Sequence, residues 1–182
     1  MPIGLSRRAF LAGTSLAALP FAPAFAQAAP ARIGLLTVRT GPLAQGGLQM
    51  EQGLTLFLKD RNNTLAGRKV ELTVADTGGN PAGAKTKAQE LVERDKVDVI
   101  VGPLAAFELL AITDYIAEAK VPMLSLAAAD DMTQRKPNPW FIRASATSSQ
   151  CCHPLADYAA KELKLKAAAT ITEDFAFGYE QS

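Results

Sequence analysis

From residue 30 onward, short apolar runs alternate with stretches whose apolar residues recur at helical spacing. Met50, Leu54 and Phe57 fall on one face of a helix, and a similar pattern runs through 109–116 and 154–163. Asn80-Pro81 marks another helix start, because Asn caps a helix and Pro fits its first position. The apolar runs predict six strands, at 32–38, 70–75, 97–101, 122–126, 140–143 and 167–172.

This alternation of strands and helices predicts an α/β fold, with a doubly wound parallel sheet covered by helices on both faces. Ligands of such sheets bind beyond the carboxyl ends of the strands, where the strand order reverses. The residues that follow the strands are therefore the first place to look for a site. They lie at 40–46, 102–107, 127–131 and 173–177.

The first 26 residues have the features of an export signal rather than of a folded element. Arg7-Arg8 precedes a mildly apolar run over 11–25, and Ala24-Phe25-Ala26 supplies small residues before a cleavage point at Gln27. The paired arginines favour a twin-arginine signal, with an ordinary secretory signal as the alternative. The run is too short and too broken by proline for a stable membrane insertion, so we expect export to the periplasm.

The composition and net charge of the chain indicate which kinds of molecule it can bind. The 182 residues include 19 basic and 18 acidic side chains, for a net charge of +1, and 48% are hydrophobic. These values are typical of a globular protein and leave no excess charge for docking on nucleic acid or an anionic membrane.

Few residues suggest catalysis. His153 is the single histidine and follows the adjacent pair Cys151-Cys152, a trio that cannot converge on one metal ion from a helix. Neither the dinucleotide-binding nor the phosphate-binding glycine signature occurs. The paired carboxylates Asp130-Asp131 and Glu173-Asp174 are read as helix caps or solvated groups, with ligand contact as the alternative. We therefore expect no enzyme activity, no metal and no cofactor.

Several segments together resemble periplasmic binding proteins of the leucine/isoleucine/valine type. The resemblance implies a two-lobed protein that captures a small solute and delivers it to the permease of an ABC-type importer. It places lobe 1 at 30–143, a hinge at 144–150 and the beginning of lobe 2 at 151–182. A ligand-sensing regulatory module on the same fold is the alternative. The segments that carry the resemblance are 40–44, 65–72, 75–82, 97–104, 121–129, 137–143 and 174–178.

The same resemblance implies a ligand site on two loops of lobe 1 and one aromatic residue of lobe 2. Amino-acid binders of this type carry hydroxyl side chains where this chain has Ala106 and Ala129. The missing hydroxyls favour an aromatic or aliphatic acid over a free amino acid. The implied ligand-binding residues are Ala105, Ala106, Phe107, Ala127, Ala128, Ala129 and Phe177.

Members of this family are about twice as long as this chain. Lobe 2 receives only one predicted helix and one predicted strand, at 167–172. These are too few to bury both faces of a sheet. We therefore expect a truncated copy in which residues 27–182 alone bind ligand weakly and self-associate.

The export signal leads to a first prediction. Mass spectrometry of the periplasmic protein should show Gln27 at the amino terminus. Replacing the twin arginines, Arg7→Lys together with Arg8→Lys, should leave the precursor inside the cell, because the receptor reads the arginine pair. Undiminished export of this variant would assign the segment to the general secretory route instead.

Overall fold

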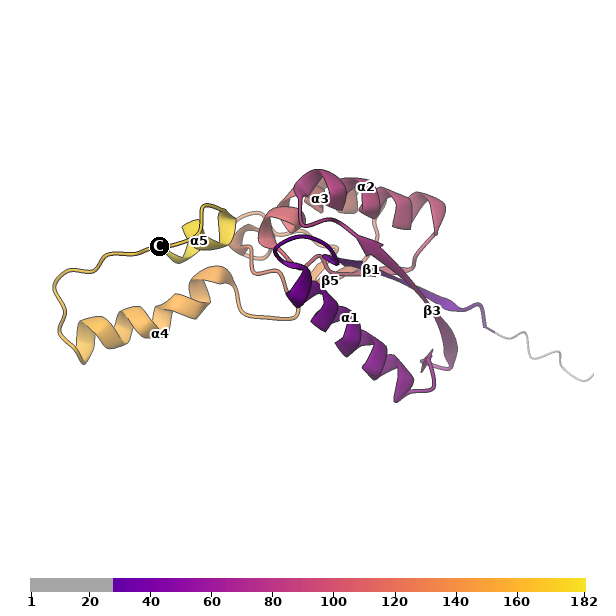
Figure 1. Cartoon of the computed structure of the whole chain (residues 1–182), viewed down its shortest axis with the longest axis horizontal. Helices are drawn as coiled ribbons and strands as arrows, with labels where there is room; N and C mark the ends of the chain where they lie inside the picture. The colour runs from indigo at the N-terminus through magenta and orange to yellow at the C-terminus, as the bar shows by residue number, and fades with distance from the viewer. Residues whose placement is uncertain (1–27) are drawn as a thin grey trace, which may run out of the picture.

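The structure, a computed structural model, describes residues 28–182. The predicted export signal and its cleavage point after Ala26 lie outside the described residues. Figure 1 shows a central sheet with α2 and α3 on one face and α1 on the other. The predicted α/β class, with a mostly parallel sheet, is confirmed.

The sheet has six strands in the order β2-β3-β1-β4-β5-β6. Five of them are parallel and match predicted strands, whereas the short β2 pairs antiparallel with β3 and was not predicted. β1 lies in the middle and pairs with β3 on one side and with β4 on the other. The bounds are β1 Ala31–Thr37, β2 Thr64–Leu65, β3 Arg68–Asp76, β4 Val99–Val101, β5 Met123–Ser125 and β6 Phe141–Arg143.

The helices follow the predicted pattern as far as β6. Asn80 caps α2 as expected, since its side chain accepts a hydrogen bond from the Gly83 N–H at 2.8 Å. The α-helices are α1 Ala44–Lys59, α2 Pro81–Gln89, α3 Ala106–Ala119, α4 Ser148–Lys161 and α5 Ala176–Gln181. A π-helical turn, η1 (Glu90–Arg94), continues α2, and a 3-10 turn, η2 (Asp130–Met132), follows β5.

The two faces of the sheet are covered unequally. Leu36, Leu91 and Ile112 belong to a fully buried core between the sheet and the α2–α3 layer. On the opposite face, Leu124 of β5 and Ile142 of β6 are 37% and 63% exposed. The prediction that helices cover both faces is therefore only partly met, because α1 packs against β1 and leaves the far strands open on that side.

Gly47 explains how α1 comes so close to the carboxyl end of β1. A Cβ atom on Gly47 would lie 1.8 Å from the carbonyl oxygen of Val38, a distance that no side chain can occupy. The Thr37 hydroxyl donates a hydrogen bond of 3.0 Å to the Gly47 carbonyl. This contact fixes the segment that leads from β1 into α1.

The helix predicted at 154–163 begins earlier, at Ser148. Thr147 caps it, because the Thr147 hydroxyl accepts from the Gln150 N–H at 3.3 Å while the Gln150 side chain accepts from the Thr147 N–H at 3.0 Å. Pro154, which was read as the helix start, lies inside α4. The last three residues of the segment expected as a hinge, 144–150, are therefore helical.

The strand predicted at 167–172 is wrong. These residues form no strand, and Ile171 is fully exposed. A strand needs a neighbour to pair its backbone groups, and no other strand of the described chain lies beside this segment. As Figure 1 shows, α4 and this segment extend away from the sheet before the chain returns in α5, a helix that the pattern did not predict.

Candidate ligand-binding site

The strand order reverses at β1, because the chain continues on one side to β3 and on the other to β4. Loops at the carboxyl ends of neighbouring strands separate at such a point and leave a crevice. Here they border an apolar cavity of about 280 Å³. Its lining residues are Leu43, Leu104, Ala105, Ala106, Leu126, Ala128, Phe175 and Phe177.

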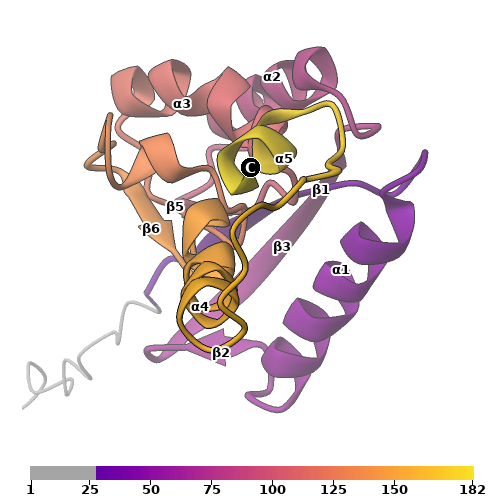
Figure 2. The same ribbon diagram turned by 90° about the vertical axis from the view of Figure 1, so that its left-hand side faces the viewer.

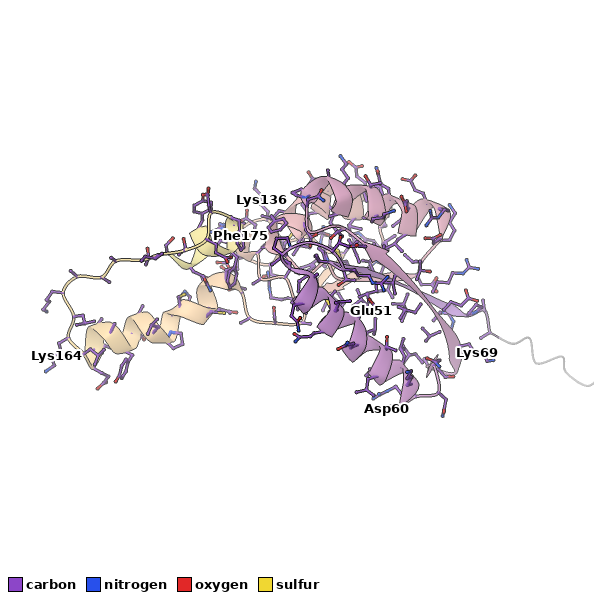
Figure 3. The ribbon with its side chains drawn as sticks, viewed as in Figure 1. Glu51, Asp60, Lys69, Lys136, Lys164 and Phe175 are labelled. Carbon is purple, nitrogen blue, oxygen red and sulfur yellow. The ribbon has the colours of Figure 1, made fainter. Side chains whose placement is uncertain are left out.

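Aromatic side chains of the carboxyl-terminal segment close one side of this cavity. The Phe175 ring meets the Phe107 ring edge-on, with centroids 5.7 Å apart, and stacks on Phe177 at 6.5 Å. Figure 3 shows Phe175 where α5 meets the body of the molecule, and Figure 2 shows α5 in front of the carboxyl ends of the strands. Phe107 thus supports the aromatic wall, while Phe177 lines the cavity directly.

The start of α3 leaves backbone donors at the cavity. Ala105, which precedes the helix, has no side-chain acceptor to cap it. Within residues 28–182 the N–H groups of Ala106 and Phe107 make no hydrogen bond. The first N–H groups of a helix point outward from its amino end, where they favour an anion.

Glu108 accepts a hydrogen bond from one of the backbone N–H groups at the start of α3. Its carboxylate accepts from the Ala105 N–H at 3.2 Å and from the Thr77 hydroxyl, and the side chain is fully buried. Burial raises the pKa of the Glu108 carboxyl above its ordinary value, because the charged form loses hydration. The nearby Asp76 carboxylate adds to this increase, and the two hydrogen bonds oppose it.

The loop after β5 is held by its carbonyl oxygens. Arg143 donates to the carbonyls of Ala127 and Ala129 at 2.7 and 2.6 Å. The backbone N–H and the hydroxyl of Ser148 donate to the Ala128 carbonyl at 2.9 and 3.1 Å. All three carbonyls are thus occupied, whereas the Ala128 N–H makes no hydrogen bond within the described residues.

Not all of the predicted site residues lie at the cavity. Ala105, Ala106, Ala128 and Phe177 line it. By contrast, Ala127 and Ala129 are buried outside its lining and serve as acceptors for Arg143. Four further lining residues were not predicted individually: Leu43, Leu104, Leu126 and Phe175. Three of them, Leu43, Leu104 and Phe175, lie in the segments 40–46, 102–107 and 173–177 that the strand pattern indicates as the place for a site.

Asp130 and Glu180, which lie beside the site, form hydrogen bonds that hold its loops and helices together. The Asp130 carboxylate accepts from the Ser149 N–H at 3.3 Å, at the start of α4. Burial opposes ionisation of Asp130, but hydrogen bonds from Ser149 and Thr147 outweigh it and lower its pKa. The Asp130 N–H donates to Glu180 of α5 at 3.0 Å, so these contacts tie both carboxyl-terminal helices to the loop after β5.

Disulfides, metal-binding groups and membrane-spanning helices are absent from the described part of the chain. Both cysteines are free, and residues 28–182 contain no group of three potential metal ligands close enough to hold an ion. None of the described helices has the length and apolar character needed to cross a membrane.

Comparison with known proteins identifies the family. Residues 30–182 match the sequence profile described as periplasmic binding protein, and the chain belongs to that family. The Leu/Ile/Val-binding protein BraC3 of Rhizobium johnstonii is 31% identical over 171 residues, which cover 92% of this chain and 46% of that protein.

Solved structures give the same result. An ABC transporter substrate-binding protein from Sphaerobacter thermophilus is 34% identical with a TM-score of 0.76, covering 84% of this chain and 42% of its own. A solute-binding protein of an ABC transporter from Rhodopseudomonas palustris BisB5, in complex with 3,4-dihydroxy benzoic acid, has the same identity and TM-score, with 84% and 41% covered. This chain therefore spans less than half the length of these relatives.

The role of Arg143 leads to a second prediction. Arg143→Met should lower the free energy of unfolding by about 2–3 kcal/mol, because two buried carbonyls lose a charged donor. Arg135→Met is the matched control, since the Arg135 side chain is 61% exposed and its ion pairs should contribute less than about 1 kcal/mol. Urea denaturation measures both. An equal decrease in the free energy of unfolding of both variants would contradict the proposal that Arg143 stabilises the loop after β5.

Proposed function

We propose that this chain is the solute-binding component of an ABC-type importer and captures a small carboxylic acid with an aromatic or aliphatic body. The observation that supports this most is the apolar cavity at the strand-order reversal, bordered by unpaired backbone N–H groups. In this proposal, residues 30–143 form lobe 1 and 144–147 act as the hinge. Residues from 148 onward contribute to lobe 2 and close over the ligand.

Backbone N–H groups would hold the carboxylate. Ala106 and Phe107 supply donors at the amino end of α3, and Ala128 supplies one from the facing loop. The field of the helix adds to the attraction for an anion. None of the lining side chains carries a hydroxyl or a charge, so the binding of the acid group depends on the backbone.

The cavity offers little to an α-ammonium group. That group needs carbonyl or carboxylate acceptors, and the carbonyls of Ala127, Ala128 and Ala129 already accept from Arg143 and Ser148. Burying an ammonium group without an acceptor costs several kcal/mol. This cost supports an acid without an amino group, although several relatives are named as Leu/Ile/Val-binding proteins.

The body of the ligand would pack against aromatic rings. Phe175 and Phe177 line the cavity together with Leu43 and Leu104 and provide its apolar surface. An aromatic ring between such walls buries a large area and allows stacked or edge-on contacts. The R. palustris relative in complex with 3,4-dihydroxy benzoic acid is consistent with a ligand of this class.

The cellular role follows from the family and the predicted signal. We propose that the chain is exported to the periplasm and hands its ligand to an ABC permease. The lining of the cavity has no titratable side chain for proton transfer, which supports a capturing role over catalysis.

The aromatic wall gives a third prediction, measured by calorimetric titration with 3,4-dihydroxybenzoate. Phe177→Ala should weaken binding about tenfold or more, because it removes a ring that faces the ligand. Tyr179→Ala is the matched control on the same helix, since Tyr179 is 63% exposed and does not line the cavity. It should bind like the parent chain.

Leucine serves as the competing ligand in the same titration. We expect it to bind at least tenfold more weakly than 3,4-dihydroxybenzoate, because the carbonyls of Ala127, Ala128 and Ala129 already accept hydrogen bonds from Arg143 and Ser148. Preferential binding of leucine would contradict the proposed ligand class. Equal losses in Phe177→Ala and Tyr179→Ala would contradict the proposed aromatic wall.

A further inference from the structure

Glu108 is an unusual neighbour for an anion site. It is fully buried three residues after Ala105, in the first turn of α3, whose Ala106 and Phe107 N–H groups are unpaired. It also connects two loops, since it accepts from Thr77 after β3 and from Ala105 after β4. A carboxylate in this position competes with a ligand carboxylate for the same helix end.

Neutral groups supply the hydrogen bonds of Glu108 within residues 28–182. Thr77 and the Ala105 N–H supply its hydrogen bonds, and Asp76 at the end of β3 is the charged group that acts on it. No lysine or arginine of the described chain forms an ion pair with Glu108. Its charge is therefore poorly balanced when it ionises.

We propose that Glu108 is a positioning residue that makes the capture of a carboxylate ligand depend on pH. Protonated Glu108 keeps Thr77 and Ala105 in place without repelling the ligand. Ionised Glu108 keeps the same contacts but sets a second negative charge beside the bound anion. This inference rests on the proposed function, because it requires a carboxylate at the amino end of α3.

The direction of the effect follows from linkage. Burial already raises the pKa of Glu108 above its ordinary value, and a bound anion should raise it further. Binding of the anion is then coupled to uptake of a proton, so affinity is greatest at low pH and falls as Glu108 ionises. The decrease in affinity should therefore occur at a higher pH than the one at which a glutamate ordinarily ionises.

The test is the affinity of the chain for 3,4-dihydroxybenzoate between about pH 5 and pH 7.5, measured by calorimetric titration. We expect affinity to be greatest at the low end of this range and to fall as pH rises, by about tenfold once Glu108 is ionised, as expected for repulsion between two nearby charges inside a protein. Glu108→Gln keeps the shape and the acceptor oxygen, so its affinity should stay constant over the same range. The neutral 3,4-dihydroxybenzamide should show no pH dependence with either chain.

A second variant keeps the test decisive if Glu108→Gln folds poorly. Thr77→Val removes a hydrogen bond that lowers the pKa of Glu108, so the fall in affinity should move to higher pH. His153 is exposed in α4 and serves as a control, so His153→Asn should leave the profile unchanged.

The outcomes separate the two proposals. A flat profile in the parent chain, or a parent-like slope in Glu108→Gln, overturns the role of Glu108 and leaves the ligand class intact. Absence of binding at every pH overturns the proposed function and this inference with it.

Discussion

The hydrogen bonds from Arg143 and Ser148 to the loop after β5 determine the character of the whole site. A loop at the end of a parallel strand carries both donors and acceptors, and the buried groups need partners. Here the carbonyls of Ala127, Ala128 and Ala129 accept hydrogen bonds from Arg143 and Ser148. The cavity is therefore lined by apolar side chains, and unpaired backbone N–H groups border it. This arrangement suits a ligand with a carboxylate group.

The same contacts couple the site to the carboxyl-terminal segment. Ser148 is the first residue of α4, and Arg143 is the last residue of β6, so the two donors flank the connection at 144–147. Asp130 binds the start of α4 through Ser149 and binds Glu180 of α5 through its own N–H. A shift of either helix would therefore disturb the loop that borders the ligand cavity.

Much of the fold, but less of the site, follows from the sequence. Buried strands such as β1 and β4 are short continuous apolar runs, so periodicity and turn residues identify them. The start of α4 depends on the cap formed by Thr147 and Gln150, while Pro154 suggested a later start. The run at 167–172 looks like a strand, but a strand exists only with a neighbour. Arg143 contacts residues 14 and 16 positions away, which no local pattern reveals.

The central claim is that backbone N–H groups at the amino end of α3 and in the loop after β5 hold a carboxylate. Titration of the ¹⁵N-labelled chain with 3,4-dihydroxybenzoate, followed by amide NMR, tests it most directly. We predict that the largest shifts occur at the amides of Ala106, Phe107 and Ala128, with little change along α1. Shifts confined to α1, or no shifts at saturating ligand, would contradict the account.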